Sequence, residues 1–228
     1  MKAETPAAHS NLNPPINMKR ILPLLSLLLC LAAFTACEDN LEETQSKEFT
    51  DNWKTRNADY FHARMDEAKT AVAAARQAYG DDWEAHCDWR VYRSYAKMPG
   101  GIEADSICAK VVARGEGADV PLYTDSVKVN YVGRLMPTQS YEDGLVFDHS
   151  GLYAEDDYVF NPQLSQPASF LVSNLIEGYT TALLHMHVGD RWRIFIPQEL
   201  GYTSISTKVI PPYSTLVFDL QLRAVMRP

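Results

Sequence analysis

The stretch VIPPYSTLVFDLQL, residues 209–222, places two adjacent prolines directly before a regular alternation of side chains. Alternation with a period of two predicts a β-strand with one buried face. That face is formed by Leu216, Phe218, Leu220 and Leu222. Proline has no N–H for a sheet ladder, so Pro211 and Pro212 are expected before the strand or at an edge. The chain must therefore fold into a sheet that it enters through a conformationally fixed loop.

Three other segments predict strands of the same sheet. They are residues 107–117, 125–135 and 190–197. Between them, residues 176–186 carry Ile176, Tyr179, Thr180 and Leu183 on one helical face. An antiparallel, twisted sheet wrapped around one short helix is an α+β architecture.

A long helix is predicted ahead of the sheet. Apolar residues recur at spacings of three, four or their multiples from Phe49 to Tyr79, and Gly80 ends the run. Such a stripe has to be covered, by the downstream domain, by a second copy or by a client protein. Its bulky, irregular aromatic residues favour packing on the downstream domain. Residues 83–98 are aromatic and weakly alternating, which allows a strand there.

The first residues of the chain have the layout of a signal peptide. A basic pair, Lys19 and Arg20, precedes an apolar run shorter than the ~20 residues of a membrane-spanning helix. We predict a signal peptide over residues 1–36, with Met18 as the start of translation. Residues 34–37 resemble a bacterial lipobox with Cys37 as the lipidated residue, followed by an acidic linker to residue 48. The alternative is an ordinary secretion signal that leaves Cys37 as a thiol.

Charge and cysteine content limit the remaining possibilities. The net charge of −8 and the lack of a Lys/Arg cluster argue against nucleic acid as a partner. No Cys/His spacing predicts a zinc site, and His185 and His187 point apart at a helix end, so no metal is expected. In an oxidising envelope Cys87 and Cys108 could form a disulfide, which the sequence leaves open.

Four separated stretches, in this order, resemble FKBP-type peptidyl-prolyl cis-trans isomerases. They are VKVNYVGRL, DGLVFDHS, FLVSNLIEGYTTALLHMHVGDRWRIFIPQELGY and VIPPYSTLVFDLQL. The resemblance covers residues 102–226 and leaves residues 49–101 as an N-terminal helical segment. It implies an FKBP-like fold and an enzyme that rotates X-Pro bonds in unfolded or exported proteins. The rotation barrier of roughly 20 kcal/mol comes from amide resonance, so neither a nucleophile nor a cofactor is needed.

The resemblance also implies a set of site residues. A hydrophobic cup would bind the proline ring, with Asp148, Tyr202 and Tyr131 as the polar groups that act on the amide. The backbone N–H of Ile210 would be free to bind a substrate carbonyl. The cup would be lined by Phe147, Phe170, Leu175, Ile176, Tyr179, Ile210 and Phe218.

The chain departs from the family pattern at several positions. Tyr179 replaces the usual tryptophan of the cup floor and brings a hydroxyl that needs a partner. Ala168 replaces an aromatic residue, and Thr203 replaces a glycine, so that turn is expected to need a different backbone. The segment between Asp148 and Phe170 is also long. These departures put macrolide binding in doubt.

The sequence therefore predicts a lipid-anchored isomerase of the bacterial cell envelope, facing the periplasm or the cell surface, that assists the folding of exported proteins. One alternative is an FKBP-fold chaperone or binding lipoprotein with little or no turnover. Another is a surface interaction protein that binds its partner through the long segment after Asp148.

Overall fold

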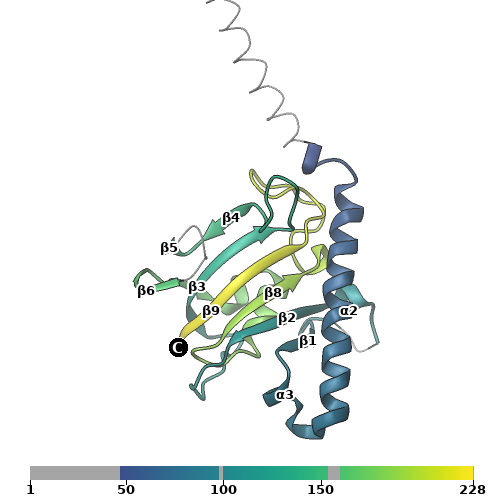
Figure 1. Cartoon of the computed structure of the whole chain (residues 1–228). Helices are drawn as coiled ribbons and strands as arrows, with labels where there is room; N and C mark the ends of the chain where they lie inside the picture. The colour runs from purple at the N-terminus through teal and green to yellow at the C-terminus, as the bar shows by residue number, and fades with distance from the viewer. Residues whose placement is uncertain (1–46, 98–99, 154–159, 228) are drawn as a thin grey trace, which may run out of the picture. The chain divides into compact units, whose positions relative to one another are not determined.

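The structure is a computed structural model that describes residues 47–97, 100–153 and 160–227 (Figure 1). The predicted signal peptide, the lipidation residue Cys37 and most of the acidic linker lie outside the described residues. Within those ranges, no helix has the length and apolar character needed to cross a membrane. The described residues belong to one compact unit, 47–228.

One antiparallel sheet of seven strands forms the centre of the fold. Its strand order is β1-β2-β8-β9-β3-β4, and β7 pairs with the same side of β3 as β4. The strands are β1 (Trp89–Arg93), β2 (Ser106–Ala113), β3 (Ser126–Leu135), β4 (Val146–His149), β7 (Ala168–Leu171), β8 (Arg191–Ile196) and β9 (Leu216–Met226). A separate pair, β5 (Gly151–Tyr153) and β6 (Phe160–Ser165), lies in the long segment after Asp148. The α+β class expected from the sequence is confirmed.

Alternation along the strands gives the sheet two buried faces. On β9, Leu216, Phe218, Leu220 and Leu222 join the core beneath the short helix α4 (Glu177–Leu183). The intervening Val217 packs on the opposite face, beside Phe195 of β8. Both assignments agree with the pattern predicted for the last strand.

The long helix α2 (Trp53–Tyr79) covers that opposite face (Figure 1). Its buried stripe extends to Ala75, and the helix ends before Gly80, whose positive φ of 58° suits glycine. Phe61, Met65 and Val72 form a second core with residues of β1, β2, β8 and β9. Packing on the downstream domain, the alternative favoured by the sequence, is therefore confirmed, although Tyr79 at the helix end is half exposed.

The aromatic segment after α2 contains the short helix α3 (Trp83–His86) and strand β1. Val91 of β1 lies opposite Cys108 of β2, so the helical segment and the domain predicted from the resemblance share one sheet. This register also accounts for the cysteines. Cys87 precedes β1 and does not face Cys108, and both thiols are free and buried. Burial raises the pKa of the Cys108 thiol, and the disulfide that the sequence left open is absent from the described residues.

Candidate functional site

A cavity of about 200 Å³ lies where β3, β4, β7 and β9 meet the beginning of α4. It contains every residue predicted for the site except Ile210. It is lined by Tyr131, Phe147, Asp148, Phe170, Asn174, Leu175, Ile176, Tyr179, Tyr202 and Phe218. We call this cavity the cup.

The walls of the cup are aromatic rings packed edge to face. The ring of Phe218 makes this contact with Phe147 at 5.5 Å between centroids and with Tyr179 at 5.1 Å. The absence of a side chain at Gly133 makes the first contact possible. A Cβ there would lie 2.6 Å from the Phe147 ring and 2.8 Å from the Phe218 ring. These packed rings give the cup a fixed apolar shape suited to a small ring such as that of proline.

Asp148 supplies the only carboxylate among the residues that line the cup. The Tyr131 hydroxyl donates a hydrogen bond to Asp148 Oδ2 at 2.7 Å, and the His149 backbone N–H donates to Oδ1 at 2.9 Å. Burial, and then the neighbouring Asp148, raise the pKa of Tyr131. The phenol therefore stays protonated at neutral pH and keeps the carboxylate oriented.

Tyr179 forms the floor of the cup and is fully buried. Its hydroxyl has no hydrogen-bond partner among the described residues. Burial raises its pKa well above the usual value, and Tyr131 and Asp148 add to the shift. The sequence analysis expected this hydroxyl to need a hydrogen-bond partner, and the described protein atoms do not supply one.

The structure contradicts the prediction for Ile210. Its N–H is not free but donates to Thr207 Oγ1 at 2.9 Å, and its buried side chain joins the core rather than the cavity lining. The cause is local, because a threonine hydroxyl three residues earlier in a loop can accept the amide of the residue it faces. Ile210 therefore belongs to the same hydrophobic core as Tyr179 and Phe218.

Thr203, at the position where the resemblance implies a glycine, has an unusual backbone conformation. Thr203 adopts φ of 53°, the left-handed region that glycine favours, so the turn keeps a glycine-type backbone despite the side chain. Tyr213 in the same loop has φ of 64° and donates its N–H to the Thr203 carbonyl at 2.7 Å. The two strained residues are thus bonded to each other.

Asn174 lines the cup and was not predicted. It lies in the turn Val172–Asn174, between the predicted residues Phe170 and Leu175. Its position within that matched stretch was the only sequence signal for it, and an exposed polar residue in a turn does not by itself indicate a site.

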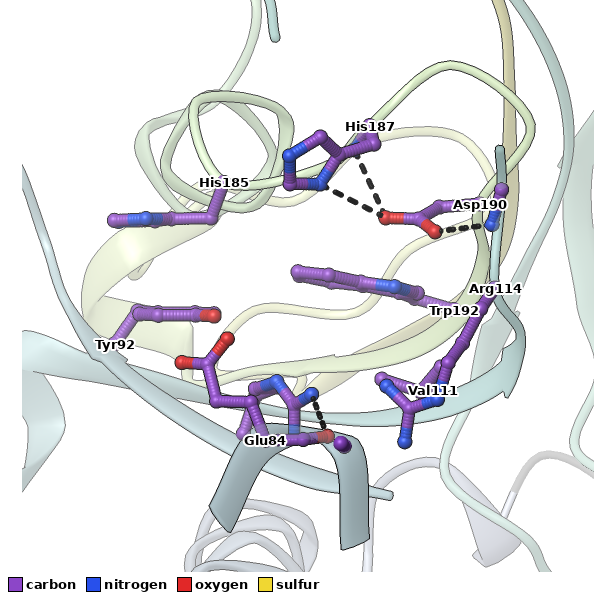
Figure 2. A pocket seen from close by; sticks show the side chains of 11 residues that line it. Glu84, Tyr92, Val111, Arg114, His185, His187, Asp190 and Trp192 are labelled. Atoms are coloured by element: carbon purple, nitrogen blue, oxygen red, sulfur yellow. Dashed lines mark hydrogen bonds and ion pairs between the residues drawn. The ribbon is translucent and has the colours of Figure 1, made fainter. Parts of the chain in front are cut away.

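A second cavity, of about 230 Å³, lies beyond the other end of α4 and contains both histidines considered for a metal (Figure 2). His185 stacks on Tyr92 with 3.8 Å between ring centroids, and burial lowers the pKa of His185. His187 instead faces Asp190, with its Nδ1 3.9 Å from Oδ2. The two rings have different partners, and no group of residues in the described part of the chain is suited to hold a metal ion.

Comparison with known proteins supports the resemblance found in the sequence. Residues 118–223 match the family model of the FKBP-type peptidyl-prolyl cis-trans isomerases. This part of the chain is therefore similar in sequence to that family. It contains every residue that lines the cup.

Individual proteins are also similar to this chain in sequence. The chain is 40% identical over 118 residues to the FKBP-type 22 kDa peptidyl-prolyl cis-trans isomerase of Escherichia coli, covering 51% of this chain and 48% of that protein. It is 37% identical over 130 residues to the macrophage infectivity potentiator of Trypanosoma cruzi, covering 57% and 55%. It is 33% identical over 131 residues to the outer membrane protein MIP of Legionella longbeachae, covering 57% and 46%. The chain thus spans about half the length of the curated relatives it matches.

Proposed function

We propose that the protein is a peptidyl-prolyl cis-trans isomerase and that the cup is its active site. The observation that carries this proposal is a carboxylate, Asp148, oriented by Tyr131 at the side of a rigid aromatic cavity. The match of residues 118–223 to the isomerase family supports it.

The chemistry requires a site that fits the twisted amide better than the planar one. The apolar cup removes water from the proline ring, and amide resonance is lost as the bond rotates. The carboxylate of Asp148 is placed to interact with the turning amide dipole. The hydroxyl of Tyr202, which also lines the cup, would donate a hydrogen bond to a substrate carbonyl. Such a bond contributes roughly 1 kcal/mol net, so most of the binding free energy comes from apolar contact.

A protease-coupled isomerisation assay on the chain from Glu38 onward tests the proposal. Peptides that differ in the residue before proline should isomerise faster in the presence of the protein. Tyr202→Phe should reduce this acceleration. If no peptide is accelerated, the proposal fails. Suppression of client aggregation would then be measured, because a binding module on the same scaffold would retain it.

We also propose that the enzyme acts on exported proteins from a lipid anchor on Cys37 in the bacterial envelope. Support comes from the signal-peptide layout of residues 18–37 and from the name of the Legionella relative, an outer membrane protein. Metabolic labelling with a palmitate analogue should mark the wild type and not Cys37→Ser, with Cys87→Ser as the labelled control. Equal labelling of wild type and Cys37→Ser would contradict the anchor.

A further inference from the structure

The loop 203–215 connects two residues of the cup, Tyr202 before it and Phe218 on β9 after it. The loop holds the left-handed residues Thr203 and Tyr213, which are strained for any residue other than glycine. Strain of this kind persists only where the surroundings over-determine the conformation. The contacts that hold this loop therefore matter for the geometry of the cup.

The first such contact comes from the beginning of α2. The indole N–H of Trp53 donates to Ser214 Oγ at 3.1 Å, and the Ser214 hydroxyl donates to the Pro211 carbonyl at 2.7 Å. Trp53 and Ser214 are both buried, so water does not compete for these bonds. One helix residue is thus linked to Ser214, two residues before β9, and through it to the carbonyl of Pro211.

Asn57, one turn later on α2, makes the second contact. Its Oδ1 accepts the Thr215 N–H at 2.7 Å, and its backbone carbonyl accepts the Thr215 hydroxyl at 3.0 Å. The Asn57 amide group donates back to the Trp53 carbonyl at 2.8 Å, which fixes the orientation of the side chain. Asn57 and Thr215 are each 1% exposed. A fully buried asparagine in a helix is unusual. Here its side-chain oxygen accepts a hydrogen bond from the loop.

The contacts continue to the cup. Tyr213, next to Ser214, donates its N–H to the Thr203 carbonyl, and Thr203 directly follows Tyr202. The ammonium group of Lys54 on α2 lies 4.5 Å from the centre of the Tyr213 ring. Helix α2 therefore contacts the loop at Ser214, Thr215 and Tyr213, and Tyr213 is bonded back to the residue after Tyr202.

We propose that Trp53 and Asn57 are positioning residues of the isomerase, which set the place of Tyr202 at the cup by holding the loop 203–215. This inference rests on the proposed function. Neither residue touches the cup, and both lie outside the segment 118–223 that matches the family. The helix that precedes the family domain would then be part of the working enzyme and not only a cover for its sheet.

Steady-state kinetics on the chain from Glu38 onward test the proposal, with Trp53→Phe, Asn57→Ala and Val72→Ala compared well below their melting temperatures. Val72 is a matched control because it is buried on the same helix, about 22 Å from Asn57 along the helix axis. We expect kcat/KM to fall about tenfold in Asn57→Ala, less in Trp53→Phe, and not in Val72→Ala. Equal kcat/KM in all three variants, with equal losses of melting temperature, would overturn the positioning role.

A double-mutant cycle measures a coupling in kcat/KM that a loss of stability alone would not produce. Trp53→Phe and Ser214→Ala remove the same hydrogen bond, so their effects on kcat/KM should be strongly non-additive. Additive effects would mean that the bond does not act on the cup.

Hydrogen exchange separates failure of this proposal from failure of the proposed function. If the wild type has no isomerase activity, the amides of Ile210 and Tyr213 should still exchange faster in Asn57→Ala than in Val72→Ala. Equal exchange in the two variants would show that α2 does not hold the loop, whatever the protein catalyses.

Discussion

The two faces of the central sheet are built by the same strands but differ in what they enclose. Beneath α2, Phe61, Met65 and Val72 meet Val217 and Phe195 in a continuous apolar core. On the α4 side, the same alternation places Phe218 and Tyr131 around a cavity with a carboxylate at its side. One face is filled by a helix of 27 residues, whereas the other has a helix of 7 residues that leaves the cup open beside it.

This difference separates stability from activity. Phe61, Met65 and Val72 of the core beneath α2 should affect mainly the free energy of unfolding, because they do not line the cup. Under the proposed function, Asp148 and Tyr202 of the cup should affect mainly catalysis, since they line the cavity that would bind the substrate. Trp53, which reaches the core of the α4 side from α2, is where the two faces meet.

Met65→Ala should give the largest effect and confine it to stability. Met65 is fully buried beneath α2, and truncation of such a side chain costs about 2–5 kcal/mol. Urea denaturation should show this loss, while kcat/KM at temperatures where the variant is folded should equal that of the wild type. A reduced kcat/KM in the folded variant would break the separation between the two faces.

Asp148→Ala should lower catalytic activity and leave stability almost unchanged. Loss of a charge-assisted interaction of about 1.5–3 kcal/mol corresponds to a fall in kcat/KM of about 10- to 100-fold. The melting temperature should change little, because the carboxylate is exposed in the cup. Asp143→Asn, an exposed acid outside the cup, is the control and should keep full activity.

Tyr179→Phe tests the floor of the cup. The change removes a buried hydroxyl without a described partner, so the free energy of unfolding should rise by about 1 kcal/mol or more. Thermal denaturation and kcat/KM would be measured together. A loss of stability would show that the hydroxyl has a partner, such as a bound water, that the described atoms do not include.

Thr203→Gly should stabilise the protein by about 1 kcal/mol. Glycine accepts a positive φ without the strain of a β-branched side chain, although part of the gain is offset by its greater freedom in the unfolded chain. Ser206→Gly, at an exposed loop position without positive φ, is the control and should not stabilise. A destabilised Thr203→Gly would mean that the threonine side chain itself holds the loop.

His185 should give the smallest effect, a dependence of stability on pH. Burial lowers its pKa in the folded state below the ordinary 6.5, so the unfolded chain binds the proton more readily. Its contribution is fully present above pH 6.5 and is lost as the pH falls towards the lower folded pKa. Denaturation at pH 7.5 and 5.0 should show a smaller loss in His185→Gln than in the wild type, whereas an equal loss would contradict this assignment.

Much of this comparison was accessible from the sequence. Alternation placed Val217 and Phe218 on opposite faces, and the helical spacing predicted α2 and its packing. The matched stretches identified the cup because its residues are side chains at fixed positions within those stretches. The long-range pairing of β1 with β2 was only allowed, not predicted, because the five residues of β1 carry too weak a period.

The features that the sequence did not predict are backbone groups in one loop. The bond from the Ile210 N–H to Thr207 depends on how the loop turns, which no side-chain pattern specifies. The left-handed Thr203 is held by Tyr213 and, through its neighbours, by α2, so tertiary contacts override the local preference of threonine. Local sequence reasoning fails where distant segments decide a backbone conformation.

The pairing of β1 with β2 bears on where the chain can be cut. A fragment restricted to residues 118–223 would lack β1 and β2. The edge of β8 that pairs with β2 would then have unpaired N–H and C=O groups. It would also lose α2 and expose Val217 and Phe195 to water. An open β-strand beside an apolar surface is a template for self-association. We therefore expect residues 118–223 alone to self-associate more readily than the chain that includes α2, β1 and β2.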